Sequence, residues 1–417
     1  MKFHLKMKSQ DISGKISIGG SKSISNRLLI IRSIADSNID IDNISLSDDS
    51  QNLLDLLEKI RDGEKSNIPV ILDIKNTGTA ARFLTAYLTT IEGAWFITGK
   101  DRMRQRPMNG LVDALLELGA NISYAEKTGF IPIKITGANL RGNEISIDVS
   151  QTSQFLSAIM MIGPYLEEGI RIRMQNKPVS MPYVEMTRIL MQQFNASVNI
   201  SSNIIDIKPS HYKFRRITVE PDWSSASYWY ELIALSKDGK IELPGFSKDS
   251  IQGDSILAEV YENLGVTTTY TNDGIVIERN LEPKSMFSFD FSGSPDIVPS
   301  VLTTCAALEI KSEFKNISHL KHKESDRINA LTIELRKIGA IITQSGNNLI
   351  LKSGGKLSNK INFDTHNDHR MAMAFAPLAL KFPEITIDNP YVVNKSYPEY
   401  WDEIKKLNFA FLKLTTD

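Results

Sequence analysis

One local pattern recurs along this chain of 417 residues: an amphipathic helix, a Gly or Asn that stops it, and a run typical of a β-strand. The pattern returns at intervals of roughly 60–75 residues, which is too long for the common solenoid repeats. It predicts an α+β fold of about six similar units, three in each of two similar domains. Helix ends of this kind also occur in unrelated α/β proteins, so the repeat alone leaves that alternative open. The expected helices are residues 53–60, 112–118, 186–194, 258–264, 332–338 and 403–407.

The clearest domain boundary lies near Glu220-Pro221-Asp222. There a strand-like stretch, residues 216–219, gives way to a Ser-rich segment in which Asp222 is the expected N-cap of a new helix. No linker rich in Pro, Gly or Ser separates the two halves of the sequence. We therefore expect the two halves to hinge over a cleft.

Composition and charge exclude several classes of protein. The chain carries 48 Lys and Arg against 49 Asp and Glu, a net charge of −1, which argues against a broad nucleic-acid surface. No apolar run approaches the ~18–20 residues of a membrane helix, and the first residues lack the apolar core of a signal peptide. The single cysteine, Cys305, excludes a disulfide framework and is expected as a packed core thiol. These features predict a cytoplasmic protein.

Three segments combine small residues or Pro with basic side chains, which suits the binding of anions. Gly19-Gly20-Ser21-Lys22-Ser23 leads into a predicted helix, whose free N–H groups and dipole favour negative charge. It is not a Walker A loop, because Ser21 precedes Lys22 where that motif needs Gly. Asn76–Arg82 follows the same logic, with Asn76 or Thr77 as a helix cap. Lys100, Arg102, Arg104 and Arg106 alternate before Pro107, so an extended segment would align them on one face. The plain alternatives are capped turns and a solvated charged edge.

Two later segments combine cations with carboxylates or histidines. Residues 321–327 hold three cations and two carboxylates, a set suited to acid–base work beside an anion, or to a surface salt-bridge cluster. His366 and His369 are three residues apart, as are His319 and His322. Such pairs can bind zinc, but each lies beside Lys or Arg, so we expect no metal.

Taken in order, these motifs resemble the family of 5-enolpyruvylshikimate-3-phosphate synthases, the 3-phosphoshikimate 1-carboxyvinyltransferases, over nearly the whole chain. One such motif is weak support, whereas a full set in the right order is highly specific. The segments that carry the resemblance are GSKSISNR (20–27), NTGTAAR (76–82), RQRPMNGLVDAL (104–115), SQF (153–155), VSMPY (179–183), DWSSASY (222–228), KESDR (323–327), NDHRMAM (367–373) and NKSYPEY (394–400).

The resemblance implies two domains, each of three α/β units around a pseudo-threefold axis, with the active site in the cleft between them. One domain would be discontinuous, residues 1–20 with 221–417, and the other inserted, residues 21–220. The implied reaction moves the enolpyruvyl group of phosphoenolpyruvate to the 5-hydroxyl of shikimate 3-phosphate and releases phosphate, a step of aromatic amino acid biosynthesis. The resemblance also implies a monomer that needs no metal or organic cofactor and that glyphosate inhibits.

Both substrates carry carboxylate and phosphate groups, so cations must offset their mutual repulsion. For phosphoenolpyruvate the resemblance implies Lys22, Asn76, Gly78, Arg106, Gln154, Arg327, Arg370 and Lys395. For shikimate 3-phosphate it implies Lys22, Ser23, Arg27, Thr152, Ser153, Gln154, Ser180, Tyr183, Asp296, His319 and Lys323. For catalysis it implies Lys22, Asp296, Glu324 and His369. Asp296 matches the carboxylate that takes the hydroxyl proton, and Glu324 matches the second acid–base carboxylate. The sequence leaves open which carboxylate performs each transfer.

Four positions depart from the family pattern. His319 replaces an Asn often found in the shikimate phosphate site, and Met181 replaces a Lys. Thr152 replaces a Ser but keeps the hydroxyl, and Phe83 follows Arg82 where Pro is common. Phe83 puts the response to glyphosate in doubt.

Two other functions remain as alternatives. The related transferase that acts on UDP-N-acetylglucosamine shares the fold and the donor, but it usually carries a cysteine in its arginine loop and Lys-Asn at the first anion motif. Residues 99–108 contain no cysteine here, and Ser23 follows Lys22. A degenerate anion-binding module is the non-enzymatic alternative, although the cations and both carboxylates are retained.

Overall fold

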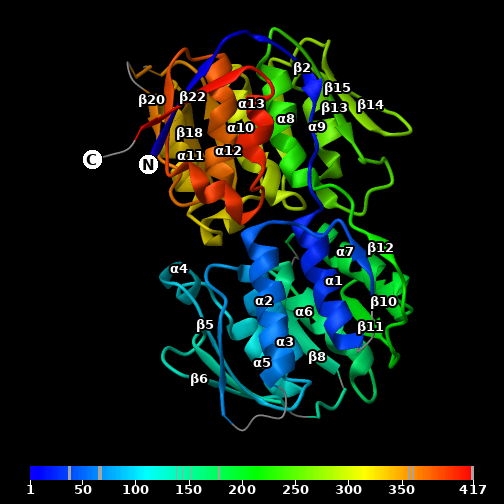
Figure 1. Ribbon diagram of the computed structural model, residues 1–417. Helices are drawn as coiled ribbons and strands as arrows, with labels where there is room; N and C mark the ends of the chain where they lie inside the picture. Colours follow the sequence, from blue (N-terminus) through cyan, green and yellow to red (C-terminus); the bar gives the residue numbers. More distant parts are fainter. Residues whose placement is uncertain are drawn as a thin grey trace. The chain divides into compact units, whose positions relative to one another are not determined.

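The computed structural model describes residues 1–35, 39–63, 68–137, 139–142, 144–150, 152–176, 179–355, 357–358 and 361–414. The chain divides into two compact units (Figure 1). The discontinuous unit combines Met1–Gly19 with Glu220–Asp417, and the inserted unit is Gly20–Val219. Each unit is described by itself below.

The discontinuous unit contains three four-stranded sheets, each built from the same βαβαββ order of elements. The copy that the chain completes without interruption comprises β16 (Met286–Asp290), α10 (Val298–Ala307), β17 (Lys311–Lys315), α11 (Arg327–Arg336), β18 (Ile341–Ser345) and β19 (Asn348–Lys352). β16 pairs parallel with β17, and β19 pairs antiparallel with both β17 and β18. The two helices of this copy therefore both start beyond the carboxyl ends of the two parallel strands.

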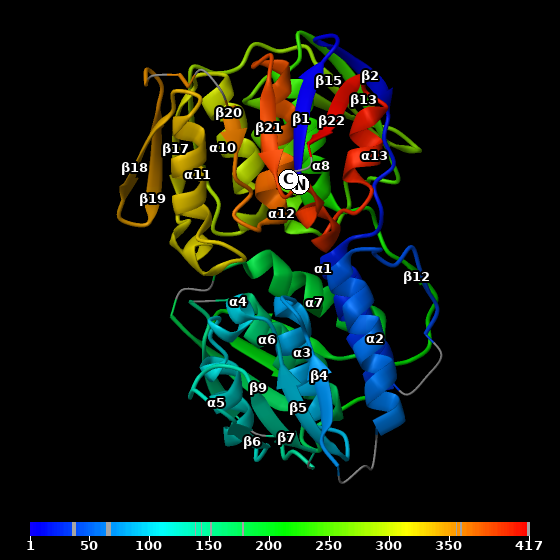
Figure 2. The same ribbon diagram turned by 60° about the vertical axis from the view of Figure 1, so that its left-hand side comes forward.

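The first residues of the chain complete the other two sheets of this unit. One sheet has β2 (Asp11–Lys15), α8 (Trp223–Leu235), β13 (Asp238–Pro244), α9 (Leu257–Glu262), β14 (Val266–Tyr270) and β15 (Gly274–Arg279). The other has β20 (Ile361–Phe363), α12 (His369–Phe375), β21 (Ile385–Asp388), α13 (Tyr400–Lys405), β22 (Phe409–Leu414) and β1 (Lys2–Met7). β2 pairs parallel with β13, and Figure 2 shows β1 between β21 and β22, where it pairs antiparallel with both.

The inserted unit repeats the same order twice and then in shortened form. One copy comprises β4 (Val70–Asp73), α3 (Gly78–Leu88), β5 (Ala94–Thr98), α5 (Asn109–Glu117), β6 (Asn121–Tyr124) and β7 (Ile133–Thr136). The next comprises β8 (Glu144–Asp148), α6 (Ser153–Ile162), β9 (Ile170–Gln175), α7 (Met181–Gln193), β10 (Val198–Ser201) and β11 (Ile204–Ile207). The short copy has β12 (Ile217–Thr218), α1 (Lys22–Ala35), β3 (Ile41–Asp42) and α2 (Asp48–Gly63), and its described residues include no closing hairpin.

These copies confirm the predicted α+β fold, with five full units and one short unit in place of six equal ones. The helices expected from the repeat are the second helices of the copies. Five of them end at a residue in the left-handed backbone region, which favours Gly and Asn. These residues are Gly119, Asn195, Gly265, Gly339 and Asn408, with φ of 87°, 76°, 94°, 84° and 66°. The predicted cap at Asp222 is also confirmed, since its Oδ1 accepts a hydrogen bond from the Ser225 amide at 3.0 Å.

The first helix of every copy forms the core of its unit. In the discontinuous unit α8, α10 and α12 pack against one another, and in the inserted unit α1, α3 and α6 do so. Their side chains are buried nearly all round, as expected for helices that are apolar on every face. Cys305 lies in α10 and is fully buried, as predicted for a core thiol.

Candidate active site

The candidate residues lie at the starts of helices. α1 begins at Lys22, α3 at Gly78 and α6 at Ser153, and α12 follows Asp368. Second helices follow the same rule, with Ser180 before α7 and Asp326 before α11. Because each helix follows a strand or loop at the same edge of its sheet, the copies place their free N–H groups and polar caps at that edge. Each unit therefore carries a polar edge suited to anions.

In the inserted unit, Asp49 connects two of the candidate motifs. The Lys22 Nζ lies 3.1 Å from Asp49 Oδ2, and the Thr77 hydroxyl donates to Asp49 Oδ1 at 3.0 Å. Asp49 is 5% exposed, so its carboxylate depends on these partners. The sequence analysis missed Asp49, because its place in the first turn of α2 carries no signal beyond an acidic helix start.

The predicted cap of α3 is wrong in its chemistry. Thr77 is the N-cap residue, but its side chain makes no capping hydrogen bond and donates to Asp49 instead. Asn76 is exposed just before it. A tertiary partner has thus taken the hydroxyl that a local cap would use.

The predicted alignment of Lys100, Arg102, Arg104 and Arg106 is also wrong. Residues Asp101–Arg104 form a short helix, α4, so the segment is not extended. Arg104 turns to the surface, where its Nη1 lies 2.9 Å from Glu126 Oε1.

Arg106 instead lies over Gly78, at the start of α3. Its side chain is nearly buried, and a Cβ built on Gly78 would stand 2.5 Å from its Nη1. The absence of a side chain at Gly78 therefore lets this guanidinium reach the start of the helix.

Arg27 is buried and bound by the protein itself. Its Nε donates to Thr187 Oγ1 at 2.7 Å, and its Nη1 donates to the Ser23 carbonyl at 2.8 Å. Its guanidinium lies 5.4 Å from the ring of Phe83, the residue found where the family often has Pro. Burial lowers the pKa of Arg27 to about 10, so it stays charged at neutral pH. Arg27 thus holds the backbone of Ser23 in place. A direct contact of Arg27 with substrate stays a prediction.

The remaining polar candidates of this unit cluster at α6 and α7. Thr152 caps α6, where its hydroxyl accepts from the Gln154 amide at 3.2 Å. Ser180 precedes α7 with a left-handed φ of 58°. The Tyr183 carbonyl accepts from Arg27 Nη2 at 3.2 Å, which links α7 to α1. Ser153, in the first turn of α6, is also buried.

In the discontinuous unit, Arg327 is the centre of the charged cluster. The side chain is 1% exposed, and its three nitrogens donate to three carboxylates. Nε binds Asp368 at 2.8 Å, Nη1 binds Asp296 at 3.1 Å and Nη2 binds Glu324 at 2.7 Å. Burial alone would lower the pKa of Arg327, but these carboxylates raise it above its ordinary value.

Asp296 faces three cations. Arg370 Nη2 donates to Asp296 Oδ2 at 2.8 Å. Lys323 Nζ lies 3.7 Å from Asp296 Oδ1, the oxygen that also accepts from Arg327. Burial favours the neutral acid, but Arg370, Lys323 and Arg327 together hold the pKa of Asp296 well below its usual range. Asp296 is therefore ionised, and the structure brings Asp296 together with residues of the KESDR and NDHRMAM segments in one cluster.

Asp368 is the carboxylate that the sequence analysis did not single out here. It is fully buried and caps α12 through the Arg370 amide at 3.1 Å. It also accepts from the Ser325 hydroxyl at 3.0 Å, in addition to Arg327. Asp368 therefore joins the start of α12 to the start of α11, and its place inside NDHRMAM was the available signal.

The two histidines lie around this cluster, and Lys395 belongs to a 3₁₀ helix that packs against α12. Burial and then Lys323 lower the pKa of His319 to about 4, so its ring is neutral at physiological pH. His369 is buried at the first position of α12, with Nδ1 3.6 Å from Asp368 Oδ1. Lys395 ends the 3₁₀ helix Pro390–Lys395, shortly before α13.

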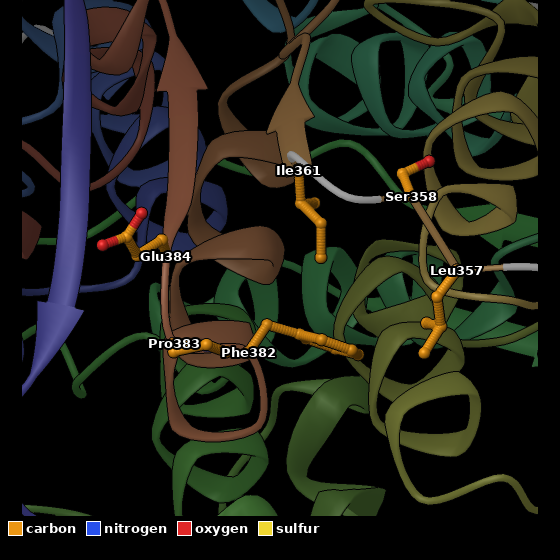
Figure 3. A pocket seen from close by; sticks show the side chains of 6 residues that line it. All are labelled: Leu357, Ser358, Ile361, Phe382, Pro383 and Glu384. Carbon is orange, nitrogen blue, oxygen red and sulfur yellow. The ribbon is translucent and has the colours of Figure 1, made fainter.

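Some features of the described residues bear on other kinds of site. No group of three or more His, Cys, Asp or Glu among them could hold a metal ion. Across the same residues, no helix is both long and apolar enough to span a bilayer. A pocket in the discontinuous unit includes Phe382 and Glu384 (Figure 3), but none of the candidate residues lines it.

Comparison with known proteins gives the class. The family model for EPSP synthase (3-phosphoshikimate 1-carboxyvinyltransferase) matches residues 6–404. A protein of Bacteroides fragilis named 3-phosphoshikimate 1-carboxyvinyltransferase is 42% identical over 413 residues, covering 98% of each chain. A protein of that name from Colwellia psychrerythraea is 36% identical, covering 95% of this chain and 97% of its own. The chain belongs to the EPSP synthase family, which confirms the assignment expected from its motifs.

Solved structures agree at the level of the fold. An EPSP synthase from Acinetobacter baumannii superimposes with a TM-score of 0.79 at 21% identity, covering 99% of this chain and all of the other. A second structure of the same enzyme gives a TM-score of 0.77. At this level of identity the likeness concerns the arrangement of the α+β units.

Proposed function

We propose that this chain transfers the 1-carboxyvinyl group of phosphoenolpyruvate to the 5-hydroxyl of shikimate 3-phosphate and releases phosphate. Membership of the family supports the reaction, and the cluster around Arg327 is the single observation that carries it here. Three cations and three carboxylates converge at the starts of α11 and α12. Such a cluster suits a reaction that binds anions and moves protons beside them.

Phosphoenolpyruvate binds the cations that the resident carboxylates now neutralise. Arg327, Arg370 and Lys323 balance Asp296, Glu324 and Asp368, so the charges of the cluster itself nearly cancel. The substrate's carboxylate and phosphate compete for the same guanidinium groups as bidentate ligands. Lys22, Asn76, Gly78, Arg106, Gln154 and Lys395 complete this donor site.

Shikimate 3-phosphate binds mainly through hydroxyl and amide groups of the inserted unit. The side chains are Ser23, Thr152, Ser153, Gln154, Ser180 and Tyr183, with Arg27 behind them and Lys22 beside them. Asp296, His319 and Lys323 come from the discontinuous unit. His319 is neutral, so it serves the phosphate as a hydrogen-bond donor and adds no charge.

The ionised state of Asp296 favours one assignment of the two proton transfers to the two carboxylates. Asp296 is ionised and carries no proton to give, so it accepts the proton of the 5-hydroxyl. Once substrate anions take Arg327 away from Glu324, Glu324 takes a proton from solvent and supplies it to the methylene carbon of phosphoenolpyruvate, and the hydroxyl oxygen bonds to the adjacent carbon. Glu324 then takes a methyl proton back as phosphate departs, which restores the double bond, and the phosphate leaves with the proton that Asp296 accepted. Substrate anions weaken the hold of Arg327 and Arg370 on Asp296, which makes it a stronger base. Lys22 and His369 lie with the phosphate that departs.

The two compact units, Met1–Gly19 with Glu220–Asp417 and Gly20–Val219, serve as the two domains, each within one residue of the bounds expected from the sequence. The enzyme acts as a cytoplasmic monomer, without metal or organic cofactor, and glyphosate competes for the phosphoenolpyruvate site.

Release of phosphate from phosphoenolpyruvate tests the proposed function. We expect release only when shikimate 3-phosphate is present, at fixed enzyme concentration. Release with UDP-N-acetylglucosamine instead would assign the chain to the related transferase. Calorimetric binding of shikimate 3-phosphate without any release would mean a binding module, and the proposal would be wrong.

A further inference from the structure

Asp254 lies at a position that the other copies use for candidate site residues. It belongs to the 3₁₀ turn Gly253–Ile256, which leads directly into α9, the second helix of its copy. The segments before α5, α7, α11 and α13 carry Arg106, Ser180, Lys323 with Glu324, and Lys395. The sequence motifs assign no role to Asp254. The repeat therefore indicates a functional position that has no assigned residue.

Hydrogen bonds hold Asp254 beside the loop of Asp296. The Ser224 hydroxyl, in the first turn of α8, donates to Asp254 Oδ2 at 2.5 Å. The Ser294 hydroxyl donates to the Gly253 carbonyl at 3.1 Å, which joins the turn of Asp254 to Ser294-Pro295-Asp296. Asp254 is 3% exposed, and its Oδ1 finds no hydrogen-bond partner among the described residues. Burying a carboxyl group whose second oxygen lacks a hydrogen bond costs free energy, so its presence in the folded protein calls for a functional explanation.

Charged groups from three elements act on Asp254. Asp296 in the turn before α10 and Asp222 at the cap of α8 disfavour its ionised form, whereas Arg370 in α12 favours it. Burial has the largest effect, and with Asp296 it raises the pKa of Asp254 to about 7, against the opposing effect of Ser224. Asp254 and Asp296 are thus neighbouring carboxyls with widely separated pKa values, an arrangement typical of acid–base sites.

We infer that Asp254 is a positioning residue whose charge sets the basicity of Asp296. The inference rests on the proposed function, in which Asp296 accepts the proton of the 5-hydroxyl. Three cations make Asp296 a weak base, and an ionised Asp254 opposes them and strengthens its hold on that proton. Asp254 itself touches no substrate and ends each cycle in the state in which it began. When Asp254 is protonated, the repulsion disappears and Asp296 returns to a weaker base.

The pH dependence of kcat for the wild type and Asp254→Asn tests this inference. Asn keeps the size of the side chain and cannot ionise. We expect the two enzymes to have similar rates at pH 6, where Asp254 is mostly neutral in the wild type. At pH 8.5 the variant should be about tenfold slower, because Asp296 lacks the neighbouring negative charge. Titration of the substrates affects both enzymes equally, so the ratio of their rates isolates Asp254.

Two further variants sharpen the test. Ser224→Ala removes a hydrogen bond that favours ionised Asp254, so the rise in rate should move to higher pH without disappearing. Asp249→Asn, an exposed site on the same segment, should give a ratio near one at every pH. A wild-type to Asp254→Asn ratio that stays constant with pH, or an unshifted profile in Ser224→Ala, would overturn the inference. Absence of turnover in the wild type would instead reject the proposed function.

Discussion

At the scale of single residues, two buried carboxylates hold the candidate cations in place. Asp49 lies between Lys22 and Thr77, and Asp368 binds Arg327 through two of its nitrogens. A long basic side chain loses considerable rotamer entropy when it binds substrate, and a fixed carboxylate removes part of that cost beforehand. Their role is to orient cations, so their loss should affect substrate binding as well as stability.

Asp368→Asn should weaken the enzyme in both respects. Arg327 is buried, and removing the charge of its fully buried partner leaves that guanidinium undercompensated, at a cost of about 3–5 kcal/mol. We expect a lower melting temperature and a higher KM for phosphoenolpyruvate, measured by calorimetry and by phosphate release. Asp402→Asn is the matched control, because Asp402 forms an exposed pair with Lys405, of a kind worth at most about 1 kcal/mol. Equal effects of the two variants would contradict the central role of Arg327.

Arg106→Ala should remove much of the stabilisation of the bound donor. Removing a nearly buried guanidinium from a substrate anion should reduce transition-state stabilisation by about 2–5 kcal/mol. This corresponds to a fall in kcat/KM of about 30-fold to several-thousand-fold. Arg104→Ala, in the same segment but paired with Glu126 at the surface, should stay close to wild type. A purified Arg106→Ala enzyme within threefold of the wild-type kcat/KM would remove Arg106 from the proposed site.

At the scale of elements, the two helices of each copy differ in how they are buried. The second helices bury one face, as in α11, where the buried residues recur three or four positions apart. The first helices are buried nearly all round and have no polar face. The sequence pattern therefore detected the second helices through their amphipathic period. The first helices α1, α3 and α8 show no such period, and the sequence predicted their starts from cap residues and small-residue turns instead.

The burial of α8 leads to a prediction about pH and stability. Glu231 lies in the middle of this helix, fully buried, and its carboxylate oxygens have no hydrogen-bond partner in the described part of the chain. Burial raises the pKa of Glu231 well above its ordinary value. The folded state therefore keeps a proton that the unfolded chain releases. The stability that this proton contributes is fully present below the pKa of Glu231 in the unfolded chain. As the pH rises from that value toward the higher pKa of the folded state, the free energy of unfolding falls by about 1.4 kcal/mol per pH unit.

Glu231→Gln should remove this dependence. We expect the variant to gain stability relative to the wild type as the pH rises from 5 to 9, measured from urea midpoints. Glu242→Gln, an exposed substitution in the neighbouring β13, should show no such trend. If the difference between wild type and Glu231→Gln did not change with pH, Glu231 would not be protonated in the folded protein.

At the scale of the whole molecule, the inserted unit is a single continuous stretch with adjoining ends. A Cβ built on Gly20, where the unit begins, would stand 3.1 Å from Cγ1 of Val219, where the unit ends. The chain therefore leaves the unit close to the point where it enters. By contrast, the discontinuous unit needs residues 1–19 to supply a strand to two of its three sheets.

Residues 20–219 should therefore fold alone. We expect dispersed amide resonances and weak binding of shikimate 3-phosphate by NMR titration, with no release of phosphate, because Asp296 and Lys323 are absent. Residues 220–417 are the comparison. Without β1 and β2 they should remain largely unfolded, since two sheets lack a strand. An unfolded 20–219 fragment would show that the inserted unit depends on the rest of the chain.

The sequence by itself determined those features that depend on a few neighbouring residues. Left-handed stops at Gly119 and Gly339, the cap at Asp222 and the order of the anion-binding motifs all follow from local backbone chemistry and residue type. Only the tertiary structure decided the partners of the charged groups. Thr77 donates to Asp49 instead of capping α3. The short helix α4 directs Arg104 to Glu126 at the surface, whereas Arg106 lies over Gly78. The physical reason is that helix starts from different copies meet at one edge of each unit. A carboxylate there takes its partner according to the fold, so the partner can be 74 residues away, as Arg370 is from Asp296, or three, as Arg327 is from Glu324.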